Sequence, residues 1–395
     1  MVDNPVITML GRRLRLAVIG GGPGSFIGAM HRSAARLDDR YELVAGALSS
    51  DPERSRSAGV GLGIVDDRAY PDAISLLQAE AARTDGADVV SIMTPNDSHH
   101  EYAAAALDLG FDIICDKPIT NTLDEALDLV KRVEQTGLVF CLTHNYTGYS
   151  LVRQAKAMVA DGQLGEVRLV QVEYVQGGKA GENDPDPAER LPWRYDPVRG
   201  GPSLVMGDIG THAHNLARFM TGLEVTEVTA EIGAIVPGRL VHDYAGALLR
   251  FDNGARGSFW VSQAAAGVEN ALRFRVSGTR GSVDWHQEEP MRLLFTPLAG
   301  PAELRTPNGP GTLPLAARST RIVAGHPEAF LEAFANIYSD AAEAIAARRS
   351  GTAPDPLALY FPNAIDGAIG LRFVEAVITS SQDGGAWTDA TPNFA

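Results

Sequence analysis

Short apolar runs separated by helix-forming stretches make up the first third of the chain. The apolar runs are residues 14–19, 41–48, 87–93, 111–115 and 138–143. Helical stretches lie between them at residues 29–37, 101–109 and 122–134, and Thr122 and Glu125 have the spacing of a capping box. Strands that alternate with helices predict a parallel sheet covered on both faces, which binds ligands at the carboxyl ends of its strands.

Longer strand-like runs begin after residue 150 and predict a mostly antiparallel sheet. One helix, residues 150–160, precedes them. The runs are residues 167–176, 225–235, 244–251, 257–262, 272–277 and 281–285. Asp252-Asn253-Gly254 predicts a hairpin turn between two of these strands. The change of pattern predicts an α/β chain with a second domain.

Four further stretches accompany the second set of strands. Residues 179–194 are rich in Gly, Pro, Asp and Glu and predict a loop near the substrate. Residues 296–314, rich in Pro and Gly, predict a surface excursion. Residues 327–349 and 364–381 predict long helices.

A glycine-rich turn follows the first apolar run. Glycines between a strand and a helix let the backbone approach a pyrophosphate, and the helix N-terminus offers free N–H groups to it. The fit to G-x-G-x-x-G is imperfect, because Ser25 stands at the third glycine position and Gly28 replaces it only in a longer turn. The turn predicts a dinucleotide site, with a glycine loop of another α/β protein as the alternative. The predicted contacts are Gly20, Gly22, Gly24, Ser25, Phe26 and Ile27.

The end of the second strand bears on the choice of cofactor. NAD-binding proteins usually place an acidic residue there, whereas this chain has Ser49 and Ser50, followed by Arg54. Hydroxyls and a guanidinium suit a ribose 2′-phosphate, so the sequence favours NADP over NAD. Two alternatives stay open: Ser49 caps the following helix and NAD binds without an acid, or Asp51 takes the acidic role.

Composition narrows the class of protein further. A chain of 395 residues with 45% hydrophobic and 21% charged residues is typical of a globular protein with two domains. The net charge of −15 argues against a nucleic acid or an anionic membrane as partner. Cys115 and Cys141 lie in apolar runs and predict buried thiols on neighbouring strands. Residues 1–13 lack the apolar core of a signal peptide and no apolar run reaches 18 residues, so a cytoplasmic protein is expected.

Asp116-Lys117-Pro118 directly follows a strand that is predicted to be buried. A lysine at the mouth of such a strand is unusual, and Thr94-Pro95-Asn96 ends what should be a nearby strand. There the ammonium of Lys117 can donate to a substrate hydroxyl and favour loss of its proton. An ordinary surface lysine is the alternative.

A second candidate for chemistry is the pair Asp208 and His212. Residues four apart share one face of a helix, and a carboxylate that orients an imidazole is typical of general acid–base catalysis. His214 points away from His212 in such a helix and contacts cofactor, substrate or neither. No metal site is predicted, because no third or fourth ligand has useful spacing.

Together these motifs resemble the Gfo/Idh/MocA family of nicotinamide-dependent sugar and inositol dehydrogenases. The matching elements, in order, are the Gly20–Gly28 turn, Thr94-Pro95-Asn96 with His99, Asp116-Lys117-Pro118, His144-Asn145, Gly165-Glu166-Val167, Gly200-Gly201, Asp208 through His212, Glu328-Ala329-Phe330 and Asn336-Ile337-Tyr338. The chain departs from the family pattern in having Asp116 where glutamate is commoner, a longer turn around Pro23, and Ser49 in place of an acid.

The resemblance implies a Rossmann domain over residues 1–146, a doubly wound parallel sheet that binds NADP or NAD. Residues 147–395 would form a substrate-binding and oligomerisation domain, built on a large open sheet, with C-terminal helices able to pack back on the first domain. A homodimer or homotetramer is implied. Lys117, Asp208 and His212 would be the catalytic set, with His212 as general base. Further cofactor contacts would be Thr94, Pro95, Asn96, His99, Asp116, Lys117 and Asn145.

The expected reaction moves a hydride between a secondary hydroxyl of a sugar, glycoside or inositol and C4 of the nicotinamide. Polar tips and an aromatic face suit a polyhydroxylated ring. Substrate contacts are therefore expected from Lys117, His144, Tyr174, Gln176, Trp193, Arg194, Asp208 and His212. Two other functions stay open: a glycosidase that retains NAD and oxidises its sugar transiently, and a non-catalytic dinucleotide-binding sensor with a protein partner. The catalytic set argues against the sensor.

Overall fold

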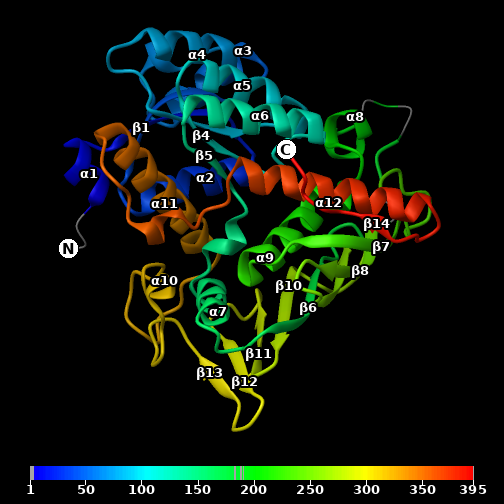
Figure 1. Cartoon of the computed structure of the whole chain (residues 1–395). Helices are drawn as coiled ribbons and strands as arrows, with labels where there is room; N and C mark the ends of the chain where they lie inside the picture. Colours follow the sequence, from blue (N-terminus) through cyan, green and yellow to red (C-terminus); the bar gives the residue numbers. More distant parts are fainter. Residues whose placement is uncertain (1–3, 182–183, 187–188, 190, 395) are drawn as a thin grey trace. The chain divides into compact units, whose positions relative to one another are not determined.

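A computed structural model describes residues 4–181, 184–186, 189 and 191–394. The chain divides into two compact units, which Figure 1 shows in the colours of the sequence. The first comprises Met1–Thr120, Asp124–Gly148 and Phe330–Gly367, and the second Asn121–Leu123, Tyr149–Ala329 and Ala368–Ala395. Residues 330–367 thus belong to the first unit. No helix in the described ranges is both long and apolar enough to cross a bilayer.

The first unit is built on a five-stranded sheet with the order β2-β1-β3-β4-β5. All four pairings are parallel, as the sequence predicts. The strands are β1 (Leu14–Gly20), β2 (Tyr41–Ala47), β3 (Val89–Met93), β4 (Asp112–Cys115) and β5 (Phe140–Leu142). The helices of this part of the chain are α1 (Pro5–Leu10), α2 (Phe26–Leu37), α3 (Pro52–Gly61), α4 (Ala73–Ala82), α5 (His99–Asp108), α6 (Leu123–Thr136) and α11 (Phe330–Ser350). Cys115 and Cys141 are free and buried on the adjacent strands β4 and β5.

The N-terminal end of α2 corrects the predicted boundary. We expected the helix to begin at residue 29, but it begins at Phe26. Ser25 is the N-cap, and its Oγ accepts a hydrogen bond from Gly28 N at 3.1 Å. Because that hydroxyl satisfies a first-turn amide, the last part of the predicted glycine turn is already helical.

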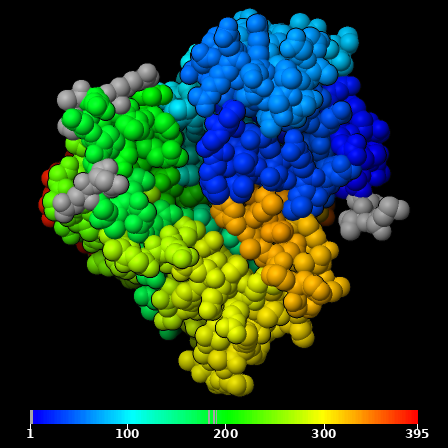
Figure 2. All heavy atoms as spheres, turned by 180° about the vertical axis from the view of Figure 1, so that it is seen from behind, coloured from blue at the N-terminus to red at the C-terminus, as the bar shows by residue number. Residues whose placement is uncertain are grey.

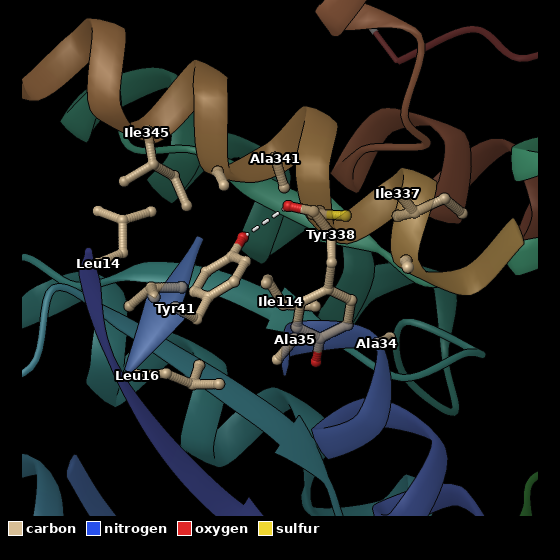
Figure 3. Packing of buried hydrophobic residues seen from close by; sticks show 14 of the residues in the cluster. Leu14, Leu16, Ala34, Ala35, Tyr41, Ile114, Ile337, Tyr338, Ala341 and Ile345 are labelled. Carbon is tan, nitrogen blue, oxygen red and sulfur yellow. Dashed lines mark hydrogen bonds between the residues drawn. The ribbon is translucent and has the colours of Figure 1, made fainter. Parts of the chain in front are cut away.

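Helix α11 packs against α2 and completes the core of the first unit (Figure 1). Its small alanine side chains allow close packing, and Tyr338 contributes its backbone oxygen as well as its ring. Tyr41 Oη donates to Tyr338 O at 2.8 Å, as Figure 3 shows, while the Tyr338 ring extends to the side of α2 that carries Ala34 and Ala35. Residues almost 300 positions apart in the sequence therefore share one core.

The second unit is built on a nine-stranded sheet with the order β13-β12-β11-β10-β6-β9-β8-β7-β14. Only the β6–β9 pairing is parallel, so the sheet is mostly antiparallel, as predicted. The strands are β6 (Val167–Val175), β7 (Val225–Gly233), β8 (Tyr244–Phe251), β9 (Arg256–Ser262), β10 (Ala271–Gly278), β11 (Gly281–His286), β12 (Leu293–Pro297), β13 (Glu303–Arg305) and β14 (Thr388–Asp389). The helices are α7 (Ser150–Ala160), α8 (Pro197–Gly200), α9 (Thr211–Thr221), α10 (Pro314–Ala317) and α12 (Ala364–Gln382).

Two loop predictions in this unit fared differently. Residues 296–314 contain the end of β12 and all of β13, which lengthen the sheet and form part of the projecting yellow lobe in Figure 2. Most of these residues are exposed, as expected of a surface excursion. The sequence did not predict the two strands, because strands of three to five residues between prolines and glycines show little periodicity. Residues 179–194 are mainly loop where they are described, and residues 182–183, 187–188 and 190 of the predicted loop lie outside the described residues.

Candidate active site

The glycine turn after β1 has no room for a side chain at several positions, of which Gly22 and Gly28 meet backbone oxygens most closely. A Cβ on Gly22 would lie 2.1 Å from Leu48 O, and one on Gly28 would lie 2.2 Å from Gly21 O. Gly24, in contrast, has a φ of +85° and no atom within 4 Å of its Cβ position. The N-terminus of α2 adjoins the turn and offers its first amides. Bare backbone, open space and a helix N-terminus together fit a dinucleotide pyrophosphate.

Phe26 and Ile27, two predicted cofactor contacts, form the first turn of α2. The Phe26 side chain is 69% exposed, whereas that of Ile27 packs against the core cluster. A ligand at these positions would therefore contact backbone amides and not the side chain of Ile27.

The end of β2 places a second set of polar groups near this turn. Ser49 Oγ accepts from Asp51 N at 3.1 Å, and Asp51 Oδ1 accepts from Arg54 N at 2.7 Å. Asp51 is thus the N-cap of α3, which corrects the alternative that Ser49 caps this helix. Arg54 donates to Pro23 O at 3.3 Å. Beside these groups, a cavity of about 440 Å³ is lined by Gly22, Pro23, Arg32, Arg54, Ser57, Ala58, Gly61 and Leu62.

Asp116 and Lys117 lie at the carboxyl end of β4, as predicted. Asp116 Oδ1 accepts from Thr143 Oγ1 at 3.0 Å and lies 3.7 Å from His31 Nε2. Burial raises the pKa of Asp116, but the neighbouring His31, followed by Lys117 and His99, outweighs burial and holds the pKa well below its ordinary value. The carboxylate next to Lys117 is therefore ionised.

His99 connects the turns after β3 and β4. Its ring has no exposed surface, with Nδ1 2.8 Å from Pro118 O and Nε2 3.0 Å from Thr94 O. Each ring nitrogen faces a backbone carbonyl oxygen of a different turn. The side chain thus holds the Thr94-Pro95-Asn96 turn beside the turn that carries Lys117.

His144 and Asn145 follow β5 and are both buried. Asn145 Nδ2 has no hydrogen-bond partner among the described residues. A buried amide donor without a partner is costly, so this position fits a ligand that brings an acceptor. It is a second observation in the first unit that fits a bound dinucleotide.

Asp208 and His212 do not lie in a regular α-helix. Met206–Gly210 forms one π-helical turn, and α9 begins at Thr211. The predicted pairing at i and i+4 assumed α-helical geometry, which a π turn changes by adding a residue per turn. Asp208 Oδ2 accepts from Gln263 Nε2 at 2.7 Å. His212 is buried, with its ring 6.4 Å from that of Tyr174 in an edge-on arrangement.

A chain of hydrogen bonds runs from Asp208 across the end of the sheet. Gln263 Nε2 also donates to Gln176 Oε1 at 3.2 Å, and Gln176 Nε2 donates to Asn270 Oδ1 at 2.6 Å. Tyr174 Oη donates to the same Asn270 oxygen at 2.9 Å. The sequence indicated Tyr174 and Gln176 but missed Gln263 and Asn270, whose only signal was a polar residue beside a predicted strand.

Three other candidates in the second unit make contacts with aromatic rings. Trp193 and Arg194 form a short 3-10 turn, with the guanidinium 4.2 Å from the indole centroid. His214 stacks on Phe373 at 4.2 Å between ring centroids. No group of three or more potential metal ligands lies together in the described part of the chain.

A parallel sheet with a dinucleotide-type turn after its first strand is typical of one class of protein, the NAD-binding oxidoreductases. Comparison with known proteins agrees with that class. Residues 14–144 match the oxidoreductase family with an NAD-binding Rossmann fold, and residues 152–284 match the Gfo/Idh/MocA C-terminal domain. The chain belongs to the Gfo/Idh/MocA family and is an oxidoreductase.

Three relatives illustrate the likeness. An uncharacterised oxidoreductase, YfiI, of Bacillus subtilis (strain 168) is 32% identical over 96% of this chain and 98% of its own. The crystal structure of an oxidoreductase from Sinorhizobium meliloti is 46% identical, covers 95% of this chain and 99% of its own, and has a TM-score of 0.86. An inositol dehydrogenase homologue from Azotobacter vinelandii, complexed with NAD⁺, is 37% identical over 96% and 97%, with a TM-score of 0.89. A second structure of that homologue contains NADH and myo-inositol.

Proposed function

We propose that this enzyme transfers a hydride between a secondary hydroxyl of a sugar, glycoside or inositol and a nicotinamide cofactor. The observation that carries the proposal is that Asp208, which accepts a hydrogen bond from Gln263, and the buried His212 lie four residues apart on consecutive helical segments. A sensor without catalysis has no need of a carboxylate and an imidazole held in this way. The myo-inositol complex of the Azotobacter vinelandii homologue makes cyclic polyols the first substrates to test.

In this mechanism three side chains act on the reacting hydroxyl. His212 takes its proton as the hydride leaves, and Asp208 orients the imidazole. Lys117 donates to the reacting oxygen and stabilises its developing negative charge. When bound, NAD(P)⁺ supplies the carbon that accepts the hydride. His144, Tyr174, Gln176, Trp193 and Arg194 are proposed to contact the rest of the substrate.

We propose NADP as the preferred cofactor. Ser49, Ser50 and Arg54 would receive the 2′-phosphate, and the nearby cavity adds the guanidinium of Arg32. Arg54→Ala should lower kcat/KM for NADP about tenfold more than for NAD, since a charge-assisted hydrogen bond contributes about 1.5–3 kcal/mol. Equal losses with both cofactors would contradict the preference.

We also propose that the protein is a homo-oligomer and that it is cytoplasmic. The outer face of the nine-stranded sheet exposes Leu169, Leu248 and Trp260, which suits contact with a second copy in a homodimer or homotetramer. Two free thiols suit the cytoplasm, where disulfides are rare.

The test is a spectrophotometric screen at about 340 nm with NAD or NADP and a panel of inositols, aldoses and glycosides. We expect turnover with at least one pair, and a loss of two to four orders of magnitude in kcat in His212→Asn. His326→Asn, at an exposed loop histidine, is the matched control and should leave kcat unchanged. Turnover that survives in His212→Asn would refute the role of His212. No turnover with dinucleotide still bound would refute the proposed reaction, and cleavage of a glycoside would then indicate a glycosidase.

A further inference from the structure

Three buried polar side chains that the proposed reaction does not use form a cluster behind Asp116. His31 comes from α2, Ser91 from β3 and Tyr338 from α11. Tyr338 Oη lies 2.7 Å from His31 Nδ1 and 2.9 Å from Ser91 Oγ, and Ser91 Oγ lies 3.2 Å from His31 Nδ1. The His31 side chain has no exposed surface. Burying polar side chains in a core costs folding free energy, so a cluster of three such groups needs a functional or structural explanation.

The hydroxyls of Tyr338 and Ser91 both lie near Nδ1 of His31, so Nδ1 can accept a hydrogen bond from one of them. Burial raises the pKa of Tyr338 far above its ordinary value, so the phenol remains a donor. A hydroxyl proton directed at Nδ1 leaves the ring proton on Nε2. Nε2 has no hydrogen-bond partner among the described residues, and it lies 3.7 Å from Asp116 Oδ1. In that arrangement the ring presents an N–H dipole to the carboxylate.

Few other titratable groups act on the pKa of Asp116. Lys117 and His99 act on it with positive charge, and Cys115 and Tyr338 face it as neutral groups whose pKa values are raised, first of all, by burial. His31 contributes the largest effect that opposes burial of the carboxylate. Without it, burial would make the carboxyl group easier to protonate.

We propose that His31, held by Tyr338 and Ser91, is a positioning residue that keeps Asp116 charged and in place, so that Asp116 holds the Lys117 ammonium for the reaction. This inference rests on the proposed function of Lys117. His31 itself touches neither substrate nor cofactor in this scheme. It acts through Asp116, from a helix whose first turn adjoins the dinucleotide turn.

The first test is the pH dependence of kcat for a substrate found in the screen. His31→Leu should lower kcat at about pH 6 by tenfold or more relative to pH 8, because Asp116 becomes protonated at a higher pH. Affinity for NADH, measured by fluorescence titration, should stay within about twofold. Tyr338→Phe and Ser91→Ala keep the imidazole. Each should also lower kcat at about pH 6 relative to pH 8, but by less than His31→Leu does. His31→Gln, which can place an amide N–H near the carboxylate, should restore part of the loss.

The matched control is the His100–Asp128 pair on α5 and α6, with Nε2 and Oδ2 2.9 Å apart at a partly exposed site. His100→Leu removes the same kind of pair and should leave the pH profile unchanged. A merely structural role for His31 would lower thermal stability and scale kcat equally at every pH, and this result would overturn the proposal.

The second test needs no turnover. In full-length protein labelled with ¹⁵N-histidine, Asp116→Asn should shift the ring resonances of His31, which are assigned by their absence in His31→Leu. Unchanged resonances would overturn the inference while leaving the proposed function intact. Shifted resonances without turnover on any substrate would instead refute the proposed function, and with it the role assigned to Lys117.

Discussion

One amide, Gln263 Nε2, joins Asp208 to the other polar groups at the end of the sheet. Gln263→Leu removes that donor at similar volume. We expect kcat to fall about tenfold to a hundredfold, because a hydrogen bond to a charged group contributes about 1.5–3 kcal/mol. Steady-state kinetics on the substrate from the screen would measure it. Gln163→Leu breaks an exposed Gln–Asp pair of the same chemistry, 3.0 Å long, and should have no effect. Similar kcat values in the two variants would contradict a role for Gln263.

At the residue scale, the sequence could indicate only groups linked by local periodicity or a short motif. Tyr174 and Gln176 are two residues apart on one strand, and Lys117 follows a strand directly. Gln263 lies 55 residues from Asp208 in the chain, and their contact depends on how β9 is placed in the sheet. The π turn at Asp208 was also invisible, because a single extra residue in a helical turn leaves the hydrophobic pattern almost unchanged.

Among the elements, the first turn of α2 leaves little room for change. Gly28→Ala would bring a Cβ to 2.2 Å from Gly21 O, so the helix or the dinucleotide turn must move. We expect NADH affinity to fall by two orders of magnitude or more, since backbone placement is what the turn contributes. Fluorescence titration and thermal unfolding would measure binding and stability.

The matched control for that substitution is Gly370→Ala, in helix α12. Nothing lies within 4 Å of its Cβ position, so binding should be unchanged and stability unchanged or raised by about 0.5–1 kcal/mol. If Gly28→Ala bound NADH as the wild type does, the close approach at this turn would not matter for binding.

A carboxylate at the N-terminal end of β3 predicts a pH dependence of stability. Asp88 is buried, pairs with Arg12 and Arg349, and accepts from Arg15 N at 2.8 Å. Burial raises its pKa, but the hydrogen bonds from Arg12 and Arg15 N and the charges of Arg349 and Arg12 lower it further, so the folded-state pKa lies below the ordinary value. Its stabilisation is therefore present above about pH 4 and is lost as the pH falls through the folded-state pKa.

Asp88→Asn should cost about 2 kcal/mol of unfolding free energy at pH 7, less than a fully buried pair because both arginines are partly exposed. The difference from wild type should shrink as the pH falls from 5 to 3. Urea unfolding at a series of pH values would measure it, and a difference that stayed constant over this range would argue against an ionised Asp88 as its source.

Most elements were predictable because their patterns are local. The range predicted for α7 and that for β8 agree with the structure at both ends, and the Asp252-Asn253-Gly254 turn joins β8 to β9 as expected. Errors arose where a side chain or a distant partner decides the boundary. Ser25 starts α2 early through its hydroxyl, and β12 and β13 exist because β11 provides an edge to pair with.

For the molecule as a whole, the outer face of the nine-stranded sheet predicts association. Leu169, Leu248 and Trp260 are 55%, 57% and 46% exposed, and Trp260 pairs in register with Glu173. Trp260→Glu would place like charges opposite each other, and a two-fold contact would repeat the repulsion. We expect light scattering to show a shift to monomer. Val323→Glu, at an exposed loop position, should keep the oligomer, and an unchanged mass for Trp260→Glu would exclude this face.

The return of α11 to the first unit also governs how the chain emerges from the ribosome. The five-stranded sheet is complete by residue 148, yet the helix that covers Leu14, Leu16 and Tyr41 begins only at Phe330. At about 5–20 residues per second, the nascent sheet waits on the order of ten seconds or more with an apolar face open. Cotranslational chaperones are therefore expected to bind this face, and a fragment ending near residue 148 is expected to aggregate until α11 is supplied.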